Sequence, residues 1–130
     1  MKNSALHKPS LRSLKQALKG DDHELKALLT TYHASEIALL FDALSTESHE
    51  RIIGLLPAEL ASEVLSKMGT ELHPEKLLEN LHPIRRSEII EELDYDDATD
   101  IIGQLPESQQ QEILEELGEE DAAHIRNLLT

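Results

Sequence analysis

Aspartates at helical spacing are the side chains of this sequence best suited to chemistry. Asp96 and Asp100 are four residues apart in the segment DYDDATD, with Asp97 between them. If the segment is helical, the carboxylates of Asp96 and Asp100 project from one face about 5–6 Å apart, where like charges repel. A divalent cation relieves this repulsion, and Mg²⁺ needs few protein carboxylates because it keeps several waters. The spacing therefore indicates half of a cation site. The alternative is that these acids cap a helix and aid solubility.

The other reactive residue types form no catalytic pattern. The sequence has no cysteine, so it has neither a thiolate nucleophile nor a disulfide. None of the seven histidines lies three or four residues from another, which excludes a helical pair of zinc ligands. A glycine-rich phosphate loop, a nucleophile elbow and an HExxH motif are also missing from the sequence. We therefore expect a protein that is not an enzyme, and a carboxylate-based hydrolase is the alternative that these features disfavour.

Charge is distributed unevenly along the chain, whose formal net charge is −14. Residues 1–26 carry six Lys and Arg against three acids, whereas residues 87–130 carry one against fourteen. Such an acidic surface repels nucleic acid and anionic lipid headgroups and attracts cations or a basic partner. A membrane-surface role stays open only for the basic helix expected near residues 11–19. No apolar run reaches the roughly 18 residues of a membrane span, so we expect this chain to be soluble.

An internal repeat of about 12 residues must position the acids. Each unit ends on an apolar residue and has another apolar residue four positions earlier. The unit-ending residues are Leu44, Leu56, Met68, Leu81, Leu93, Leu105, Leu117 and Leu129, spaced by twelve except for one spacing of thirteen. A short helix and a two-residue turn fit this period. Such helices need neighbours to be stable. With two earlier helices, the repeat predicts an all-α solenoid or superhelix of about ten short helices.

Proline and glycine support the predicted helix boundaries. We expect three prolines at first helical positions, where the missing N–H has no cost: Pro57, Pro83 and Pro106. Gly69 and Gly118 follow predicted helix ends, where we expect the left-handed conformation. Gly54 and Gly103 fall inside predicted helices, where glycine is unfavourable. We therefore expect a neighbouring helix to approach closely at these two positions.

The ordered series of units resembles the cytosolic N-terminal domain of the MgtE family of magnesium channels and transporters. The similarity runs from about Leu11 to Leu129, through KGDDHELKALL, LLPAELASEVLSKM, LHPIRRSEIIEELDYDDATDII and LPESQQQEILEELGEEDAAHIRNLL. The resemblance implies a right-handed superhelix of ten short helices, in agreement with the count from the repeat. We expect residues 1–10 to form a flexible N-terminus and residues 11–130 to form the superhelical domain.

The resemblance also implies a function and a set of metal ligands. In that family the domain senses cytosolic Mg²⁺, which its acids bind jointly with carboxylates of CBS domains to favour a closed state. The family's DDxxD element falls on Asp96, Asp97 and Asp100, and the glutamate of its AAEVL stretch falls on Glu63. We expect this binding to be weak because it is shared with the partner domain. Where the family often has HPAD, this chain has HASE at residues 33–36, which we expect to affect only helix capping.

The partners that the resemblance implies are a CBS domain pair and a transmembrane domain. The full-length protein would be a homodimer with this domain at the cytoplasmic face of the cell membrane. The family continues beyond the position of Thr130, so we expect a fragment of a transporter or a free-standing sensor domain. The alternative function is a metal-independent helical scaffold that binds a protein on its concave face.

Overall fold

Short α-helices follow one another along the whole chain. The computed structural model describes residues 10–130, and this range contains no strand. The first helices are α2 (Leu11–Leu18), α3 (Asp22–Leu29), α4 (Ala34–Leu40), α5 (Thr46–Leu55) and α6 (Ala58–Lys67). The later ones are α7 (Pro74–Asn80), α8 (Pro83–Glu92), α9 (Tyr95–Ile102), α10 (Glu107–Glu116) and α11 (Glu119–Leu129). Two short 3-10 helices, η1 (Phe41–Ala43) and η2 (Thr70–Leu72), lie between them. The prediction of an all-α fold of about ten short helices is confirmed. Most of the N-terminus expected to be flexible, residues 1–9, lies outside the described residues.

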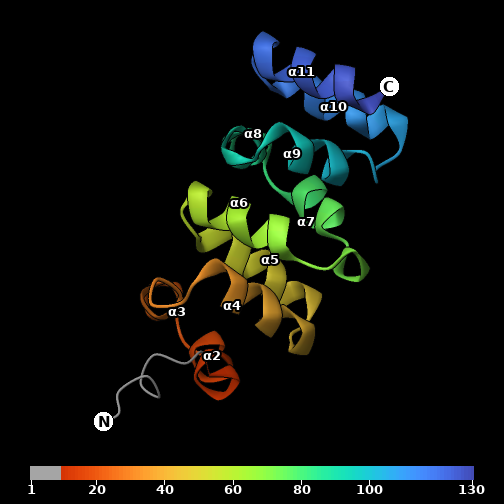
Figure 1. The fold of residues 1–130 in the computed structure, drawn as a ribbon. Helices are drawn as coiled ribbons and strands as arrows, with labels where there is room; N and C mark the ends of the chain where they lie inside the picture. The colour runs from red at the N-terminus through yellow and green to blue at the C-terminus, as the bar shows by residue number, and fades with distance from the viewer. Residues whose placement is uncertain (1–9) are drawn as a thin grey trace.

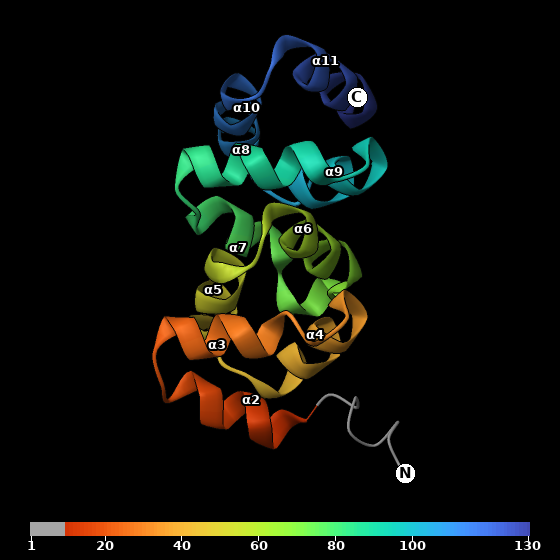
Figure 2. The ribbon, with the colours of Figure 1, turned by 90° about the vertical axis from the view of Figure 1, so that its left-hand side faces the viewer.

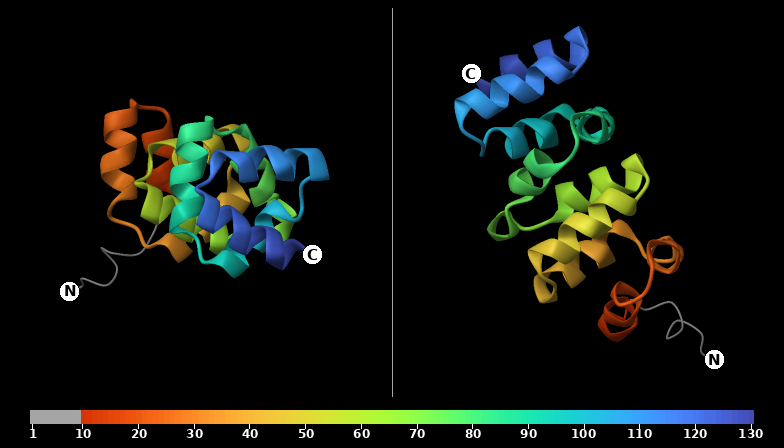
Figure 3. Two further views of the ribbon diagram at one scale, coloured as in Figure 1. Left: turned by 90° about the horizontal axis from the view of Figure 1, so that it is seen from above. Right: turned by 180° about the vertical axis from the view of Figure 1, so that it is seen from behind.

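The helices stack in chain order, with α2 at one end and α10 and α11 at the other (Figures 1 and 2). Helices two apart in sequence pack against each other. One series runs from α4 to α6, α8 and α10, and the other runs from α5 to α7, α9 and α11. Viewed from above, the helices of the stack lie largely over one another (Figure 3). The acidic third of the sequence therefore occupies the end opposite the basic α2. The right-handed sense of the superhelix stays a prediction.

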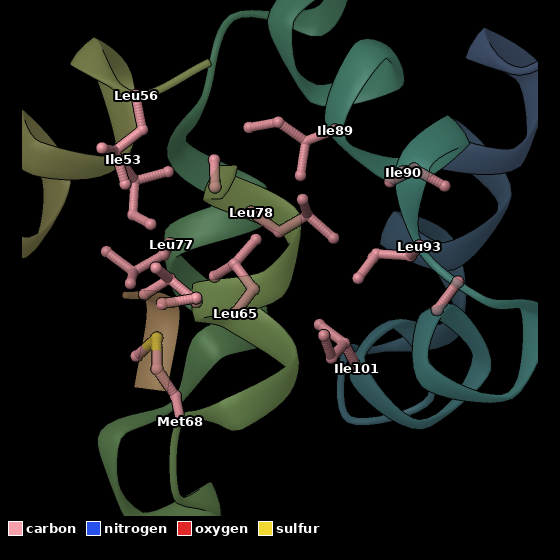
Figure 4. Packing of buried hydrophobic residues seen from close by; sticks show 14 of the residues in the cluster. Ile53, Leu56, Leu65, Met68, Leu77, Leu78, Ile89, Ile90, Leu93 and Ile101 are labelled. Carbon is pink, nitrogen blue, oxygen red and sulfur yellow. The ribbon is translucent and has the colours of Figure 1, made fainter. Parts of the chain in front are cut away.

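The apolar positions of the repeat form the core between successive helices. At the position four residues before each unit end, seven of the eight side chains are buried: Ile52, Val64, Leu77, Ile89, Ile101, Ile113 and Ile125. Figure 4 shows this packing at the centre of the stack, where Leu65, Leu78 and Ile89 converge from α6, α7 and α8. Each buried Leu or Ile contributes roughly 1.5–3 kcal/mol. This contribution holds together helices that would be marginal alone.

Short polar side chains begin several helices. The side chains of Ser10, Asp21 and Ser45 accept hydrogen bonds from backbone N–H groups three residues later, at 3.1, 2.8 and 3.2 Å. In the HASE segment, the backbone N–H of His33 donates to Glu36 Oε1 at 2.7 Å. Each of these bonds satisfies an N–H that the helix itself leaves free. The HASE segment thus caps the N-terminus of α4.

Several turns between helices use extended backbone, which corrects two sets of predictions. Pro83 is the first residue of α8, as predicted, but Pro57 and Pro106 are the residues before α6 and α10, with ψ of 148° and 151°. Gly69 and Gly118 have φ of −67° and −63°, so the predicted left-handed conformation is wrong. Both glycines are themselves the N-caps of the next helices, and an N-cap residue typically has extended backbone.

The close helix approach expected at two glycines is wrong for Gly54 and holds only loosely for Gly103. Gly54 lies within α5, yet a Cβ built there would meet nothing within 4 Å. Gly103 is the residue that ends α9 and does not lie in its interior. A Cβ there would lie 3.5 Å from Leu129 Cδ2, an ordinary contact, and 2.9 Å from the Thr99 carbonyl oxygen of its own helix.

Three arginines satisfy carbonyl groups at helix C-termini. Arg51 Nη1 donates to the Leu18 carbonyl at 2.7 Å, at the end of α2. Arg85 Nη2 donates to the carbonyls of Ile53 and Leu56 at the end of α5. Arg86 Nη1 donates to the Glu79 carbonyl at 2.7 Å, near the end of α7. These bonds replace the C-terminal cap that a left-handed glycine would otherwise supply.

Candidate metal-binding surface

The predicted aspartates occupy the first two turns of α9. Ala98 and Ile102 of this helix are fully buried, and the helix packs on α7 and α11. This packing leaves Asp96 and Asp100 exposed and Asp97 half-buried. Within residues 10–130 none of the three carboxylates takes part in an ion pair, because the four ion pairs involve other acids. Helix α9 thus presents three carboxylates without a cationic partner among the described residues.

Two of these aspartates line one cavity. The cavity has a volume of about 440 Å³ and lies between α6, α7, α9 and α11. Asp97 and Asp100, three residues apart, both line it, and Asp96 lies outside its lining. Sequence spacing alone pairs Asp96 with Asp100. The packing of α9 against α11 therefore makes Asp97 the closer companion of Asp100 in this cavity.

Glu63 lies on α6 and is exposed. It is outside the lining of the cavity that Asp97 and Asp100 share. In the described part of the chain, no three His, Cys, Asp or Glu side chains are grouped so that they could hold a metal ion. The structure therefore brings the three aspartates onto one helix but does not assemble Glu63 with two of them.

Glu75 lines the same cavity and was absent from the predicted site. It lies in the first turn of α7, and only 6% of its surface is exposed. Its Oε2 lies 3.0 Å from His73 Nδ1. His73 has a φ of 56°, and among the described residues it is the non-glycine residue with a positive φ. No sequence signal could place Glu75 near Asp97, because the proximity arises from the packing of α7 against α9.

Tyr95 joins the start of α9 to α11. Its hydroxyl donates to Asp121 Oδ1 at 2.8 Å, and its ring stacks on His124 with centroids 4.5 Å apart. The hydrogen bond to Asp121 raises the pKa of Tyr95 above its ordinary value of 10.0. Desolvation and the negative charges of Asp121 and Glu120 raise this pKa further. Tyr95 therefore links the start of α9 to α11 as a hydrogen-bond donor.

No helix in the described range combines the length and the apolar character that a membrane span requires. This finding concerns residues 10–130 alone.

Comparisons with known proteins show which family and which solved structures this chain resembles. A family model described as the MgtE intracellular N domain matches residues 32–130, more than half of the chain. Among solved structures, the chain is similar to the crystal structure of the cytosolic domain of the Mg²⁺ channel MgtE in complex with ATP. The identity is 31% and the TM-score is 0.83, over 92% of this chain and 50% of that one.

A second crystal structure, of the soluble part of a magnesium transporter, is 22% identical with a TM-score of 0.71 and supports the fold alone. That match covers 96% of this chain and 47% of the other. The chain thus spans about half the length of the solved chains it matches. A search of curated proteins found no match.

Proposed function

The chain belongs to the MgtE intracellular N domain family, and from this premise we propose that it is the Mg²⁺-sensing regulatory domain of a magnesium channel or transporter. The observation that carries the proposal is the set of three α9 aspartates without a cationic partner among the described residues. The set lies in the third of the chain that has fourteen acids and one basic residue. Transport itself would reside in a transmembrane domain outside this chain.

The residues on α9 fit a hard divalent cation. Carboxylate oxygens are the ligands Mg²⁺ prefers, and it fills its remaining positions with water or with a partner's oxygens. Asp96, Asp97 and Asp100 would supply the carboxylates of this domain. We place exposed Glu63 at a separate contact on α6, since the described fold does not group it with two of the aspartates. The domain would therefore hold only part of each site.

The proposed mechanism is a competition between electrostatic repulsion and ion binding. The acidic end of the stack would face carboxylates of a CBS domain pair in a closed state, and the two surfaces repel each other when they are close. Bound Mg²⁺ supplies the positive charge that offsets this repulsion. Because complete sites exist only when the surfaces meet, ions bind the closed state better and shift the population toward it. At low Mg²⁺ the surfaces separate and the pore would open.

The proposal also concerns the larger protein to which this domain belongs and its place in the cell. We infer that residues 11–130 act as one domain of a homodimeric membrane protein, at the cytoplasmic face of its membrane. The solved relatives, about twice as long as this chain, support the inference because they are described as the cytosolic or soluble part of Mg²⁺ transport proteins.

Limited proteolysis of the full-length gene product tests this function. We expect millimolar Mg²⁺ to protect the segment that follows residue 130, and we expect Asp96→Ala/Asp100→Ala to remove the protection. A control with Glu115→Ala/Glu119→Ala, which changes the charge equally at exposed positions of α10 and α11, should keep it. If Mg²⁺ protects neither the unsubstituted protein nor the Glu115→Ala/Glu119→Ala control, the metal-independent scaffold gains support instead. The same holds if the gene encodes no further domain.

A further inference from the structure

Helix α2 presents a basic face at the end of the stack that lies opposite the acidic third of the chain. Arg12, Lys15 and the C-cap residue Lys19 are exposed, and their spacing of three and four residues places them on one side of the helix. Leu14, the buried residue of α2, lies on a different side and packs into the core. The outer side of α2 is therefore a cationic surface.

The surrounding chain leaves most of this positive charge without a partner. Within residues 10–130 none of the three basic side chains takes part in an ion pair. The next acids along the chain are Asp21, Asp22 and Glu24 at the start of α3, and Asp22 pairs with Arg51 at 3.0 Å. Glu24 lines the hollow between α2 and α3 and offsets part of the charge. Even so, residues 1–26 carry six Lys and Arg against three acids.

Arg51 fixes the direction of α2 relative to the rest of the stack. Its guanidinium group donates to the carbonyls of Leu18 and Gly20 at 2.7 and 2.9 Å. Its Nε also donates to Asp22 Oδ1 at 3.0 Å. These bonds join the end of α2 and the start of α3 to α5. The basic face thus belongs to a helix whose orientation is set by the fold.

The acidic end of the stack is too distant to cancel the field near α2. Helices α10 and α11 lie at the far end, with α4 to α9 in between (Figures 1 and 2). Neighbouring helix axes are about 8–10 Å apart, whereas the Debye length at physiological salt is about 8 Å. The acids of α10 and α11 are therefore several screening lengths away. A surface that approaches α2 senses mainly its positive charge.

We propose that the outer face of α2 binds the anionic headgroups of a lipid membrane. Clusters of about four to eight Lys and Arg on a helix near a membrane attract anionic lipid, and residues 1–20 hold five such residues without an Asp or Glu. Headgroups require positive charge but no shaped groove, which suits a row of exposed cations. The choice of a membrane rests on the proposed place of this domain in a membrane protein. The contact itself requires no Mg²⁺ site.

Co-sedimentation of residues 1–130 with vesicles tests this surface. One kind of vesicle is phosphatidylcholine alone, and the other contains about 30% phosphatidylserine. Without Mg²⁺ and at about 0.1 M salt, we expect the chain to sediment only with the phosphatidylserine vesicles, and about 0.5 M salt should release it. Arg12→Gln/Lys15→Gln/Lys19→Gln should weaken this binding at least about tenfold, because it removes the charges of the α2 face.

A matched control removes the same charge elsewhere. Lys67→Gln/Lys76→Gln/Arg126→Gln changes three exposed cations of α6, α7 and α11 that form no ion pair in the described range. It should change the affinity by less than about twofold, since charges more than a Debye length from the membrane are screened. Equal weakening by the two triple variants would overturn the proposal. Equal sedimentation with the two kinds of vesicle, or with neither, would also overturn it.

Sedimentation velocity without vesicles examines the other anionic partner, the acidic end of a second copy of the chain. Salt-sensitive dimers that the α2 variant abolishes would assign the basic face to self-association and overturn the lipid proposal. Circular dichroism of each variant checks that its helices are retained. Absence of lipid binding together with localised Mg²⁺ shifts on α9 would reject this inference and leave the proposed sensor function intact.

Discussion

The guanidinium group of Arg86 on α8 binds both carboxylate oxygens of Glu116 on α10, with Nε–Oε1 and Nη2–Oε2 distances of 2.9 and 2.5 Å. The side chains are only 6% and 19% exposed. The same guanidinium donates to the Glu79 carbonyl near the end of α7. One side chain therefore ties together three helices of the stack.

Arg86→Met should destabilise the domain by about 3 kcal/mol, because it leaves the Glu116 carboxylate and the Glu79 carbonyl without their donor. Urea unfolding measures this change. Arg126→Met, at an exposed position of α11, is the control and should cost less than about 0.5 kcal/mol. The double variant Arg86→Met/Glu116→Met should recover part of the loss. A cost below about 1 kcal/mol for Arg86→Met would show that the pair adds little.

The repeat makes a second prediction about two leucines of opposite exposure. Leu78 is 0% exposed in α7, whereas Leu39 is 72% exposed in α4. Leu78→Ala should lower the free energy of unfolding by roughly 2–5 kcal/mol, since it removes buried methyl groups and leaves a cavity. Leu39→Ala should change it by no more than about 0.5 kcal/mol. Similar losses at both positions would contradict the assignment of Leu78 to the core, and thermal or urea unfolding distinguishes the outcomes.

Substitution by alanine should affect stability differently at Gly54 and Gly103, although the two glycines occupy equivalent positions of the repeat. Gly54→Ala should raise the free energy of unfolding by about 0.5–1 kcal/mol, because Gly54 lies in α5 and its new Cβ would meet no atom within 4 Å. Gly103→Ala should bring no gain, because its Cβ would lie 2.9 Å from the Thr99 carbonyl oxygen. The change in melting temperature measures both effects. Destabilisation by Gly54→Ala would show that the position is more crowded than the structure indicates.

Tyr95 should ionise at a higher pH in the folded domain than in the unfolded chain, because its hydroxyl donates to Asp121. The folded state therefore holds the proton more tightly. The contribution to stability is complete below the unfolded pKa of 10.0 and is lost as the pH rises through the folded value. Absorbance of tyrosinate during an alkaline titration, with Tyr95→Phe to identify the residue, measures this pKa. Asp121→Ala should lower it toward 10.0, and an unchanged pKa in that variant would exclude Asp121 as the cause.

The fold could be predicted because the apolar residues that form its core recur at a regular spacing in the sequence. The unit-ending residues Leu56, Met68, Leu81, Leu93 and Leu117 are each the first residue after a helix, so the spacing by itself located the helix ends. What failed was the conformation of the turns. Proline and glycine rules describe helices that end freely, whereas the N-cap of the next helix directly follows the residue that ends α5, α7, α8 and α10.

The site could be predicted only in part, for a related reason. Asp96, Asp97 and Asp100 share one helix, so their relation is local and can be derived from sequence spacing. The approach of Glu75 to Asp97, and of Tyr95 to Asp121, depends on how α7 and α11 pack on α9. Those contacts have no sequence signature of their own. The isolation of Glu63 from the aspartates is likewise a property of the assembled stack.

A Mg²⁺ titration of ¹⁵N-labelled residues 1–130 tests the central claim most directly, with Asp96→Ala/Asp100→Ala as the comparison. The account predicts weak but saturable shifts centred on α9, with a smaller separate response near Glu63, and loss of the α9 response in the double variant. Shifts spread evenly over the acidic end of the stack, and unchanged in that variant, would contradict it. They would mean that the ions only screen the surface charge and that this domain carries no part of a Mg²⁺ site by itself.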